Sequence, residues 1–242
     1  MNIAIAIPTY NEAGNIEKLL SSLARKTASL NDLVITVFII DDNSPDKTGE
    51  IAKGIGRKLK STIFSVAVID RPKKEGLGKA YIDGFSQILK LGFDFILQMD
   101  ADFSHDPKYL TEFVTNAGSA DFIVGSRYVK GGGTPDWAMT RKLQSRLGNF
   151  YTRVFLGSRI HDYTGGYNMY STKLLQQLDL NSIKAGGYGF LIELKYKALK
   201  RCKNAKEIAI IFKDRQHGKS KIPRSTILKN LLVVPHIKFS KN

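Results

Sequence analysis

The chain has 242 residues, of which 43% are apolar and 24% charged, the proportions of an ordinary globular protein. This length allows one α/β domain with a sizeable core, or two small domains at most. The single cysteine, Cys202, excludes an intramolecular disulfide and fits a reducing compartment. No apolar run reaches the ~18 residues of a membrane span, so we expect a cytoplasmic protein or a peripheral one on the cytoplasmic face of a membrane.

The charge of the chain is unevenly divided. Residues 1–130 hold 16 Lys and Arg against 16 Asp and Glu, whereas residues 131–242 hold 21 against 6, which accounts for the whole net charge of +15. A basic half beside a neutral half indicates a polyanionic partner, such as a phosphorylated substrate, an anionic membrane surface or nucleic acid. The alternative is a basic surface that only keeps the protein soluble.

In the first half of the chain, short apolar runs alternate with helical patterns. The runs predict strands at residues 3–7, 33–40, 64–69, 93–97 and 122–124. The first helical stripe is formed by Ile16, Leu19, Leu20 and Leu23. Asn11 is expected to cap this helix. The alternation predicts an α/β fold with a mostly parallel, Rossmann-like sheet that carries helices on both faces.

Acidic residues follow two of these strands. Asp41 and Asp42 end the second strand, and Asp100 and Asp102 follow the fourth. Residues i and i+2 of an extended segment project the same way, so Asp100 and Asp102 can converge on one hard cation. Mg²⁺ and Mn²⁺ take such oxygen ligands together with substrate phosphates. The alternative is that these carboxylates bind no metal and only precede a helix. Asp106 is a typical N-cap residue and Pro107 a typical first residue of a helix.

The second half begins with a predicted helix at residues 137–155. Arg141, Ser145 and Asn149 share one face of it, which is either a solvated surface or a binding face. We then expect a turn-rich loop at 161–168, a helix at 188–199, a strand at 208–212 and a basic loop at 215–221. The final segment, 223–242, is amphipathic with basic flanks and could lie in a membrane interface or dock as a core helix.

Five short motifs follow one another along the chain. They are Pro8-Thr9-Tyr10-Asn11-Glu12, residues 41–46, Arg71 with residues 74–78, residues 99–107, and Gly125-Ser126-Arg127-Tyr128. These motifs and their order resemble family 2 glycosyltransferases with the GT-A fold. Within that family, residues 137–149, 162–167 and 188–193 resemble the dolichol-phosphate (polyprenol-phosphate) mannosyltransferase branch. The resemblance implies one catalytic domain at 1–222, with a nucleotide-sugar half (1–130) and an acceptor half (131–222).

The resemblance also implies roles for individual residues. Asp100, Asp102, Arg127 and Arg141 would be the catalytic set. Asp100 and Asp102, with Ser104, would hold Mg²⁺ or Mn²⁺ on the donor diphosphate. The donor would be bound by Pro8, Tyr10, Glu12, Asp42, Lys79 and Asp100, and the acceptor phosphate by Arg127, Arg141, Ser145, Arg215 and Lys221. One departure concerns Asn168, which stands where the branch has an arginine.

The function implied is metal-dependent, inverting transfer of a hexose, first of all mannose from GDP-mannose, to a polyprenyl or dolichyl phosphate. Such an acceptor is already an anionic nucleophile, because the second pKa of a phosphate monoester is ~6, so no general base is required. UDP-glucose or another UDP-sugar is the alternative donor. The partners expected are the nucleotide sugar, the polyprenyl phosphate and a membrane surface, alone or with a membrane-embedded partner protein, but not nucleic acid.

Other classes of protein fit less well. A phosphohydrolase of the haloacid dehalogenase type would have its Asp-x-Asp on an early strand and a further acid pair later in the chain. Here the order is reversed, because Asp41-Asp42 precedes Asp100-Ala101-Asp102. A sugar nucleotidyltransferase would open with a Gly-rich loop, which Pro8 to Glu12 is not. A nucleic-acid-binding protein would explain the positive charge, but the acid clusters would repel the phosphate backbone. His105 has no second histidine at ligand spacing and is expected to shape its loop.

Overall fold

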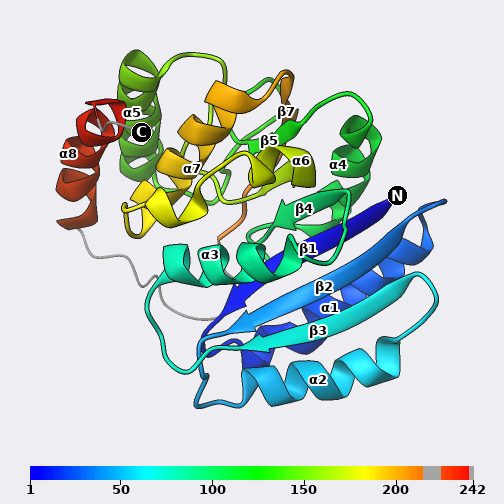
Figure 1. Ribbon diagram of the computed structural model, residues 1–242. Helices are drawn as coiled ribbons and strands as arrows, with labels where there is room; N and C mark the ends of the chain where they lie inside the picture. The colour runs from blue at the N-terminus through cyan, green and yellow to red at the C-terminus, as the bar shows by residue number, and fades with distance from the viewer. Residues whose placement is uncertain (215–224, 240–242) are drawn as a thin grey trace.

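Seven strands form one sheet in the order β3-β2-β1-β4-β6-β5-β7 (Figure 1). The computed structural model describes residues 1–214 and 225–239. The strands are β1 (Asn2–Thr9), β2 (Val34–Asp41), β3 (Phe64–Asp70), β4 (Phe95–Gln98), β5 (Phe122–Ser126), β6 (Asn168–Ser171) and β7 (Ala205–Ala209). β6 pairs antiparallel with β4 and β5, and the other pairings between these strands are parallel. The prediction of a mostly parallel sheet is confirmed.

Helices cover both faces of this sheet. They are α1 (Ala13–Ala28), α2 (Thr48–Leu59), α3 (Leu77–Ile88), α4 (Leu110–Ala117), α5 (Met139–Leu156), α6 (Thr172–Gln176), α7 (Tyr188–Arg201) and α8 (Ser225–Phe239), with short 3₁₀ turns η1 (Pro107–Tyr109) and η2 (Leu180–Ser182). Successive residues of β1 face opposite sides: Ala4 and Ala6 join the core under α3 and α7, and Ile3, Ile5 and Ile7 join the core under α1 and α4. A strand buried on both faces explains why the predicted strands are continuous apolar runs.

Three local expectations are corrected by the structure. Asn11 does not cap α1; it has a positive φ of 58° and Glu12 is the N-cap residue, while the Ala13 N–H donates to Asp46 Oδ2 at 3.0 Å. The loop expected at 161–168 ends in β6, a strand that was not predicted. The last strand lies at Ala205–Ala209, earlier than the expected 208–212, and Ile211 makes only an isolated bridge to Gly133.

Helix α8 packs beside α5 at one end of the molecule (Figure 1). Val234 and Ile237 are buried in the core, whereas Leu232 and Phe239 remain exposed. This part of the C-terminal segment therefore docks against the core, which was one of the two expectations. The exposed Leu232 and Phe239 leave the other expectation, a membrane-interfacial segment, untested. Among the residues described, none of the helices is both long and apolar enough to cross a membrane. The predicted basic loop at 215–221 lies outside the described residues.

Two glycines of α2 give a matched test of how closely this helix approaches the sheet. A Cβ added at Gly56 would lie 2.8 Å from Cβ of Val66 in β3, whereas one at Gly54 would meet nothing within 4 Å. We expect Gly56→Ala to lower the free energy of unfolding by about 1–3 kcal/mol through overpacking. Gly54→Ala should raise it by up to about 1 kcal/mol through helix propensity. Urea denaturation measures both, and equal effects would contradict this packing.

Candidate active site

The carboxyl ends of β1, β2 and β4 bring the first group of predicted site residues to one edge of the sheet. Register pairs Thr9 with Asp41, and the Asp42 N–H donates to the Thr9 carbonyl at 3.1 Å. On the other side of β1, the Met99 N–H donates to the Ala6 carbonyl at 3.1 Å. The loops that carry Tyr10, Asp42 and Asp100 therefore start side by side, where ligands of open α/β sheets bind.

The loops after β1 and β2 are tied together by backbone N–H groups. The Asn11 N–H donates to Ser44 Oγ at 3.1 Å, and the Glu12 N–H donates to Thr48 Oγ1 at 2.9 Å. Asp41 shapes the second loop, because its carboxylate accepts from the Thr9 hydroxyl at 2.8 Å and from the Ser44 N–H at 2.9 Å. Both Asp41 oxygens are thus bound within the loop, whereas Asp42 pairs with Arg71.

Arg71 binds several acidic side chains at this edge of the sheet. It is 5% exposed and binds three carboxylates, those of Asp42, Asp83 (2.8 Å) and Glu75 (3.1 Å). Burial raises the pKa of Asp42 above its usual value, in spite of the opposing effect of Arg71. This buried guanidinium fixes the position of Asp42.

The other predicted donor residues surround this group. Lys74 places its ammonium 3.9 Å from the ring centre of Tyr10, a cation–π contact that links the β3–α3 loop to the β1–α1 loop. Pro8 is half-buried in β1, Glu12 accepts from the Asn15 amide at 2.8 Å, and Lys79 is exposed on the first turn of α3. The edge therefore offers an aromatic ring, carboxylates and lysines to a ligand.

Asp100 and Asp102 follow β4 in a tightly bonded loop. Asp102 is 4% exposed, and its Oδ1 accepts from the Ser104 N–H at 3.0 Å and from the Ser104 hydroxyl at 2.6 Å. Phe103, between them, has a φ of 63°, a left-handed conformation that is strained for a bulky residue and is typical of functional loops. Asp100 is one-third exposed, and the Tyr81 hydroxyl lies 3.5 Å from its Oδ1.

His105 holds the loop that carries Asp100 and Asp102. It is 1% exposed, its Nδ1 accepts the Asp100 N–H at 2.9 Å, and its ring stacks on Tyr167 with centroids 4.8 Å apart. Burial lowers the pKa of His105, which favours the neutral ring. Because Nδ1 accepts a hydrogen bond, the proton of the neutral ring is on Nε2. This arrangement agrees with the expectation that His105 positions the loop.

The residues at this position fit a Mg²⁺ or Mn²⁺ ion that is shared with a substrate. Within residues 1–214 and 225–239, no group of three or more His, Cys, Asp or Glu side chains could enclose a metal. Mg²⁺ is commonly held by one or two carboxylates plus substrate phosphates and water, without a full protein cage. Asp100, Asp102 and the Ser104 hydroxyl that bonds to Asp102 are a donor set of that kind.

A second group of residues centres on a buried ion pair. Arg127, after β5, donates from Nε and Nη2 to the Asp162 carboxylate at 2.7 and 2.8 Å, and from Nη2 to Thr164 Oγ1 at 2.7 Å. Burial alone would raise the pKa of Asp162, but the charge and hydrogen bonds of Arg127 hold that pKa well below its usual value. The Lys195 ammonium donates to the Asp162 carbonyl at 2.6 Å, and burial lowers the pKa of Lys195 to about 8.

Trp137 and Tyr128 join the predicted acceptor residues to this pair. The Trp137 ring lies 3.8 Å from the guanidinium carbon of Arg141 and 5.4 Å from that of Arg127. The Ser145 and Tyr128 hydroxyls are 2.6 Å apart. Arg141 also forms a half-exposed ion pair with Asp214 at 2.8 Å. The structure therefore brings Arg127, Arg141 and Ser145 into one cluster, while Arg215 and Lys221 lie outside the described residues.

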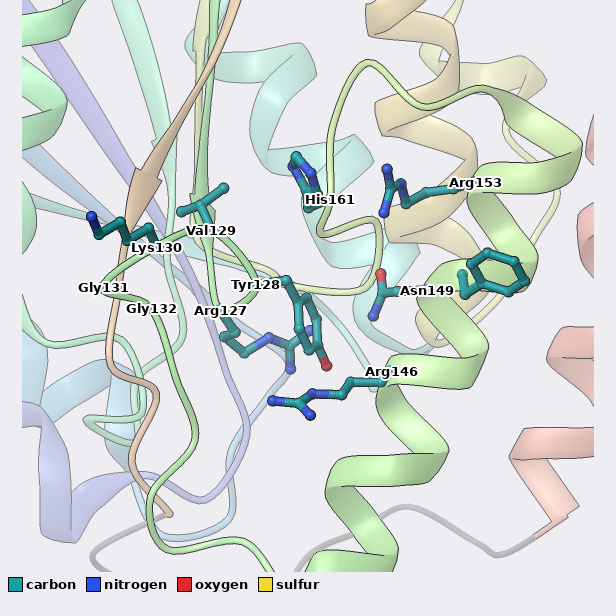
Figure 2. A pocket seen from close by; sticks show the side chains of 11 residues that line it. Arg127, Tyr128, Val129, Lys130, Gly131, Gly132, Arg146, Asn149, Arg153 and His161 are labelled. Carbon is teal, nitrogen blue, oxygen red and sulfur yellow. The ribbon is translucent and has the colours of Figure 1, made fainter.

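A cavity of about 460 Å³ opens beside this cluster, between the β5–α5 loop and α5. Figure 2 shows Arg146 reaching from α5 toward Tyr128 and Arg127, and Arg153 pointing toward His161. Lys130 lines the cavity from the opposite side. Its cationic wall suits an anionic ligand.

Several of these residues were not expected from the sequence. Arg71 and Asp162 lie within motifs that were recognised, but no role was predicted for either residue. Their place in those motifs was the available signal. Arg146 and Arg153 add to the basic excess of the second half, but only the helix geometry shows that they face the cavity. Lys195 had a weaker signal, a lysine between Leu191 and Leu199 on an apolar helix face.

Asn168 is bound inside the fold. It is fully buried at the start of β6, and its amide donates to Gln98 Oε1 at 3.0 Å and to the Gly165 carbonyl at 3.1 Å. The residue that replaces the branch's arginine therefore binds the sheet and its adjoining turn.

Comparison with known proteins assigns the class. The model of the family described as Glycosyl transferase family 2 matches residues 4–179. The chain belongs to this family, and it is a glycosyltransferase. Residues 4–179 include the sheet edge formed by β1, β2 and β4, the acid pair Asp100 and Asp102, and the Arg127–Asp162 pair.

Two relatives and one solved structure narrow the comparison. An undecaprenyl-phosphate mannosyltransferase of Micrococcus luteus is 38% identical over 224 residues, 92% of this chain and 88% of the relative. A polyprenol monophosphomannose synthase of Mycolicibacterium smegmatis is 34% identical over 232 residues, 95% of this chain and 84% of the relative. Glucosyl-3-phosphoglycerate synthase of Mycobacterium tuberculosis, solved with Mn²⁺, UDP-glucose and phosphoglyceric acid, has a TM-score of 0.68 at 18% identity, covering 99% of this chain and 81% of that one. This last likeness confirms the GT-A fold.

The variant Asp162→Asn tests the buried pair, because it keeps the shape of the side chain and removes its charge. At pH 7 we expect the free energy of unfolding to fall by about 3–5 kcal/mol, since Arg127 loses its buried partner. The folded-state pKa of Asp162 is depressed, so the pair's pH-dependent contribution is present above the unfolded pKa of about 3.9 and is lost as the pH falls toward the folded pKa.

The gap between the urea midpoints of wild type and Asp162→Asn should therefore be constant at pH 5 and above and should begin to narrow as the pH falls below about 4. The exposed Asp32, changed to asparagine, is the control and should follow wild type at pH 7. A gap between wild type and Asp162→Asn that is the same at every pH would contradict the account.

Proposed function

We propose that the protein transfers mannose from GDP-mannose to a polyprenyl phosphate, with Mg²⁺ or Mn²⁺ held by Asp100, Asp102 and Ser104. The observation that carries the proposal is the position of the arginine cluster beside the acid pair. The turn at 162–166 joins the two, because Thr164 accepts from Arg127 while Gly166 packs against His105 and Asp100. The names of the two mannosyltransferase relatives support the choice of sugar and acceptor.

In the donor half, residues 1–130, each predicted residue has a chemical task. Tyr10, Pro8, Glu12 and Asp42 form the pocket for base and ribose, and Arg71 keeps Asp42 in place. Lys79, on the first turn of α3, supplies positive charge toward the diphosphate. The bound metal ion would neutralise the charge that develops on the leaving nucleoside diphosphate. Asp100 and Asp102 orient the donor so that its anomeric carbon faces the acceptor half.

In the acceptor half, residues 131–222 together with Arg127, cations position the nucleophile. Arg141 and Ser145 bind the lipid phosphate, and Arg127 is held behind them by Asp162. Arg215 and Lys221 belong to the same proposed set. A phosphate monoester is anionic near neutral pH, so its oxygen attacks the anomeric carbon directly and no side chain has to remove a proton. The single displacement inverts the configuration of the sugar.

The proposed acceptor also implies where the enzyme works. A polyprenyl phosphate is confined to a membrane by its tail, so the protein works as a peripheral enzyme at the cytoplasmic face, alone or with a membrane-embedded subunit. The basic second half suits an anionic surface.

A donor panel tests the function. Purified protein is incubated with dolichyl phosphate, Mn²⁺ or Mg²⁺, and radiolabelled GDP-mannose, UDP-glucose or UDP-N-acetylglucosamine, and label in the lipid phase is counted. We expect label from GDP-mannose. Label from UDP-glucose alone would replace mannose by glucose, and no label from any donor would overturn the polyprenyl-phosphate proposal.

The metal site predicts the effect of Asp102→Asn. Asp102→Asn would leave the ion with Asp100 as its one charged ligand in the proposed set. This loss should lower kcat/KM by about 100-fold or more and weaken metal-dependent binding of GDP-mannose. Asp32→Asn, an exposed substitution of the same kind, should have no effect. Calorimetric titration of GDP-mannose with and without Mn²⁺ checks the binding, and full activity of Asp102→Asn would remove this residue from the site.

Arg141→Ala separates acceptor from donor. Loss of a charge-assisted hydrogen bond to phosphate should lower kcat/KM for the polyprenyl phosphate by about 10- to 100-fold and leave the KM for GDP-mannose unchanged. Arg57→Ala, on the exposed end of α2, is the matched control. Steady-state kinetics with each substrate varied in turn measures the split, and an equal rise in both KM values would contradict the assignment.

A further inference from the structure

Three charged side chains from three different elements bind the polar groups of Asp162. Arg127, after β5, binds the carboxylate at 2.7 and 2.8 Å, and the Asp162 N–H donates to Glu207 Oε1 of β7 at 3.2 Å. The ammonium of Lys195, in the middle of α7, donates to the Asp162 carbonyl at 2.6 Å. Asp162 and Lys195 are both fully buried. The position of Asp162 therefore depends on all three partners at once.

The turn at 162–166 also binds the helix that carries two of the proposed acceptor residues. Thr164 Oγ1 accepts from the Asn149 amide of α5 at 3.1 Å and from Arg127 Nη2 at 2.7 Å. Asn149 lies four residues after Ser145 and eight after Arg141, on the same face of α5. A shift of this turn would therefore move Arg127 relative to the acceptor residues of α5.

The charge of Lys195 lowers the stability of the fold. Burial lowers the pKa of Lys195 to about 8, and the charge of Arg127 adds to this effect. The carboxylates of Asp162 and Glu207 oppose it, and these three groups are the charges that face the ammonium within the described residues. A lysine whose folded-state pKa lies below its unfolded value binds its proton less tightly after folding, so the buried charge is destabilising at pH 7.

An apolar side chain would suit the same place in α7. Leu191 and Leu199, one helical turn before and after Lys195, are 3% and 6% exposed. Replacing buried charges by apolar residues of similar volume is often neutral or stabilising. The charge of Lys195 therefore contributes something other than stability, and residues that lower stability in this way occur at functional sites.

We propose that Lys195 is a positioning residue for the acceptor phosphate, because its ammonium holds Asp162 where that carboxylate directs Arg127 into the site. This inference rests on the proposed function, since it concerns the use of the polyprenyl phosphate. Being fully buried, Lys195 acts through Asp162 and not on the substrate. Loss of its proton weakens the bond to the carbonyl and removes one positive charge from behind the site.

The direction of the pH dependence follows from the charged form of Lys195. The ammonium predominates below the Lys195 pKa of about 8 and is lost as the pH rises through that value. Acceptor use should therefore decline in mildly alkaline solution. The acceptor phosphate stays a dianion and the arginines stay charged between pH 7 and 9, so these groups do not produce the decline.

Transfer kinetics with three proteins test the proposal. They are wild type, Lys195→Met, which removes the charge and keeps the length of the side chain, and the control Lys197→Met. Lys197 lies on the same helix but donates to Ser182 Oγ at 2.7 Å, away from Asp162. Transfer of mannose from GDP-mannose to dolichyl phosphate is measured between pH 7 and 9, with each substrate varied in turn.

We expect Lys195→Met to lower kcat/KM for dolichyl phosphate at pH 7 by about tenfold, the effect of losing one hydrogen bond to a charged group. Wild type should lose about fivefold between pH 7 and 9, whereas Lys195→Met stays low throughout. The KM for GDP-mannose should be unchanged, and Lys195→Met should be at least as stable as wild type to urea at pH 7. Lys197→Met should keep the wild-type pH profile, and a profile shared by wild type and Lys195→Met would overturn the positioning role.

An NMR titration separates this inference from the proposed function. The Arg127 Nε–H group, bonded to Asp162, has a ¹⁵N–¹H resonance that is observed without substrate. We expect it to shift with a midpoint near pH 8 in wild type and Lys197→Met, and to stay constant in Lys195→Met. A wild-type resonance without a transition between pH 7 and 9 would overturn the inference, even if Lys195→Met did not fold. Failure of wild type to use any polyprenyl phosphate would overturn the proposed function, and the titration would still decide whether Lys195 controls Arg127.

Discussion

The arrangement of the site depends most on the buried ion pair between Arg127 and Asp162. It fixes the end of β5 to the turn at 162–166, which packs against His105 and Asp100. Lys195 supports the pair from α7 by binding the Asp162 carbonyl. Because a buried charge is costly without a partner, the geometry is strongly determined: each side chain requires the other in this position. This requirement determines where the arginine cluster lies relative to Asp100 and Asp102.

Arg71 plays a comparable part at the edge formed by β1, β2 and β4. Its guanidinium, nearly inaccessible to solvent, binds carboxylates from the β2–α2 loop, the β3–α3 loop and α3. The two arginines differ in their surroundings: Arg71 gathers acids, whereas Arg127 shares the Trp137 ring with Arg141. One edge of the sheet is thereby suited to a metal-bound diphosphate and the neighbouring cluster to a phosphate, the two chemical groups that a sugar transfer from a nucleotide to a lipid phosphate requires.

Much of this arrangement could be predicted from the sequence. Apolar runs identified the strands, because a parallel strand is buried on both faces, and the position of Asp42 and Asp100 after those strands placed them at one edge. β6 was missed because its four residues, Asn-Met-Tyr-Ser, have neither an apolar run nor a clear alternation. Asn11 was misjudged as a cap because the first N–H group of α1, that of Ala13, is bound by Asp46, 33 residues farther along the chain. The partners of Arg71, Arg127 and Lys195 depend on such long-range contacts, which no local pattern reports.

The central claim is that the acceptor phosphate itself attacks the sugar, in one step and without an enzyme nucleophile. The anomeric configuration of the product tests this claim most directly. With GDP-α-mannose as donor, the one-bond carbon–hydrogen coupling at the anomeric position of the purified lipid product, measured by NMR, reports the configuration. Direct displacement predicts a β-mannosyl phosphate. An α-linked product would require two displacements or front-side attack, and would contradict the account.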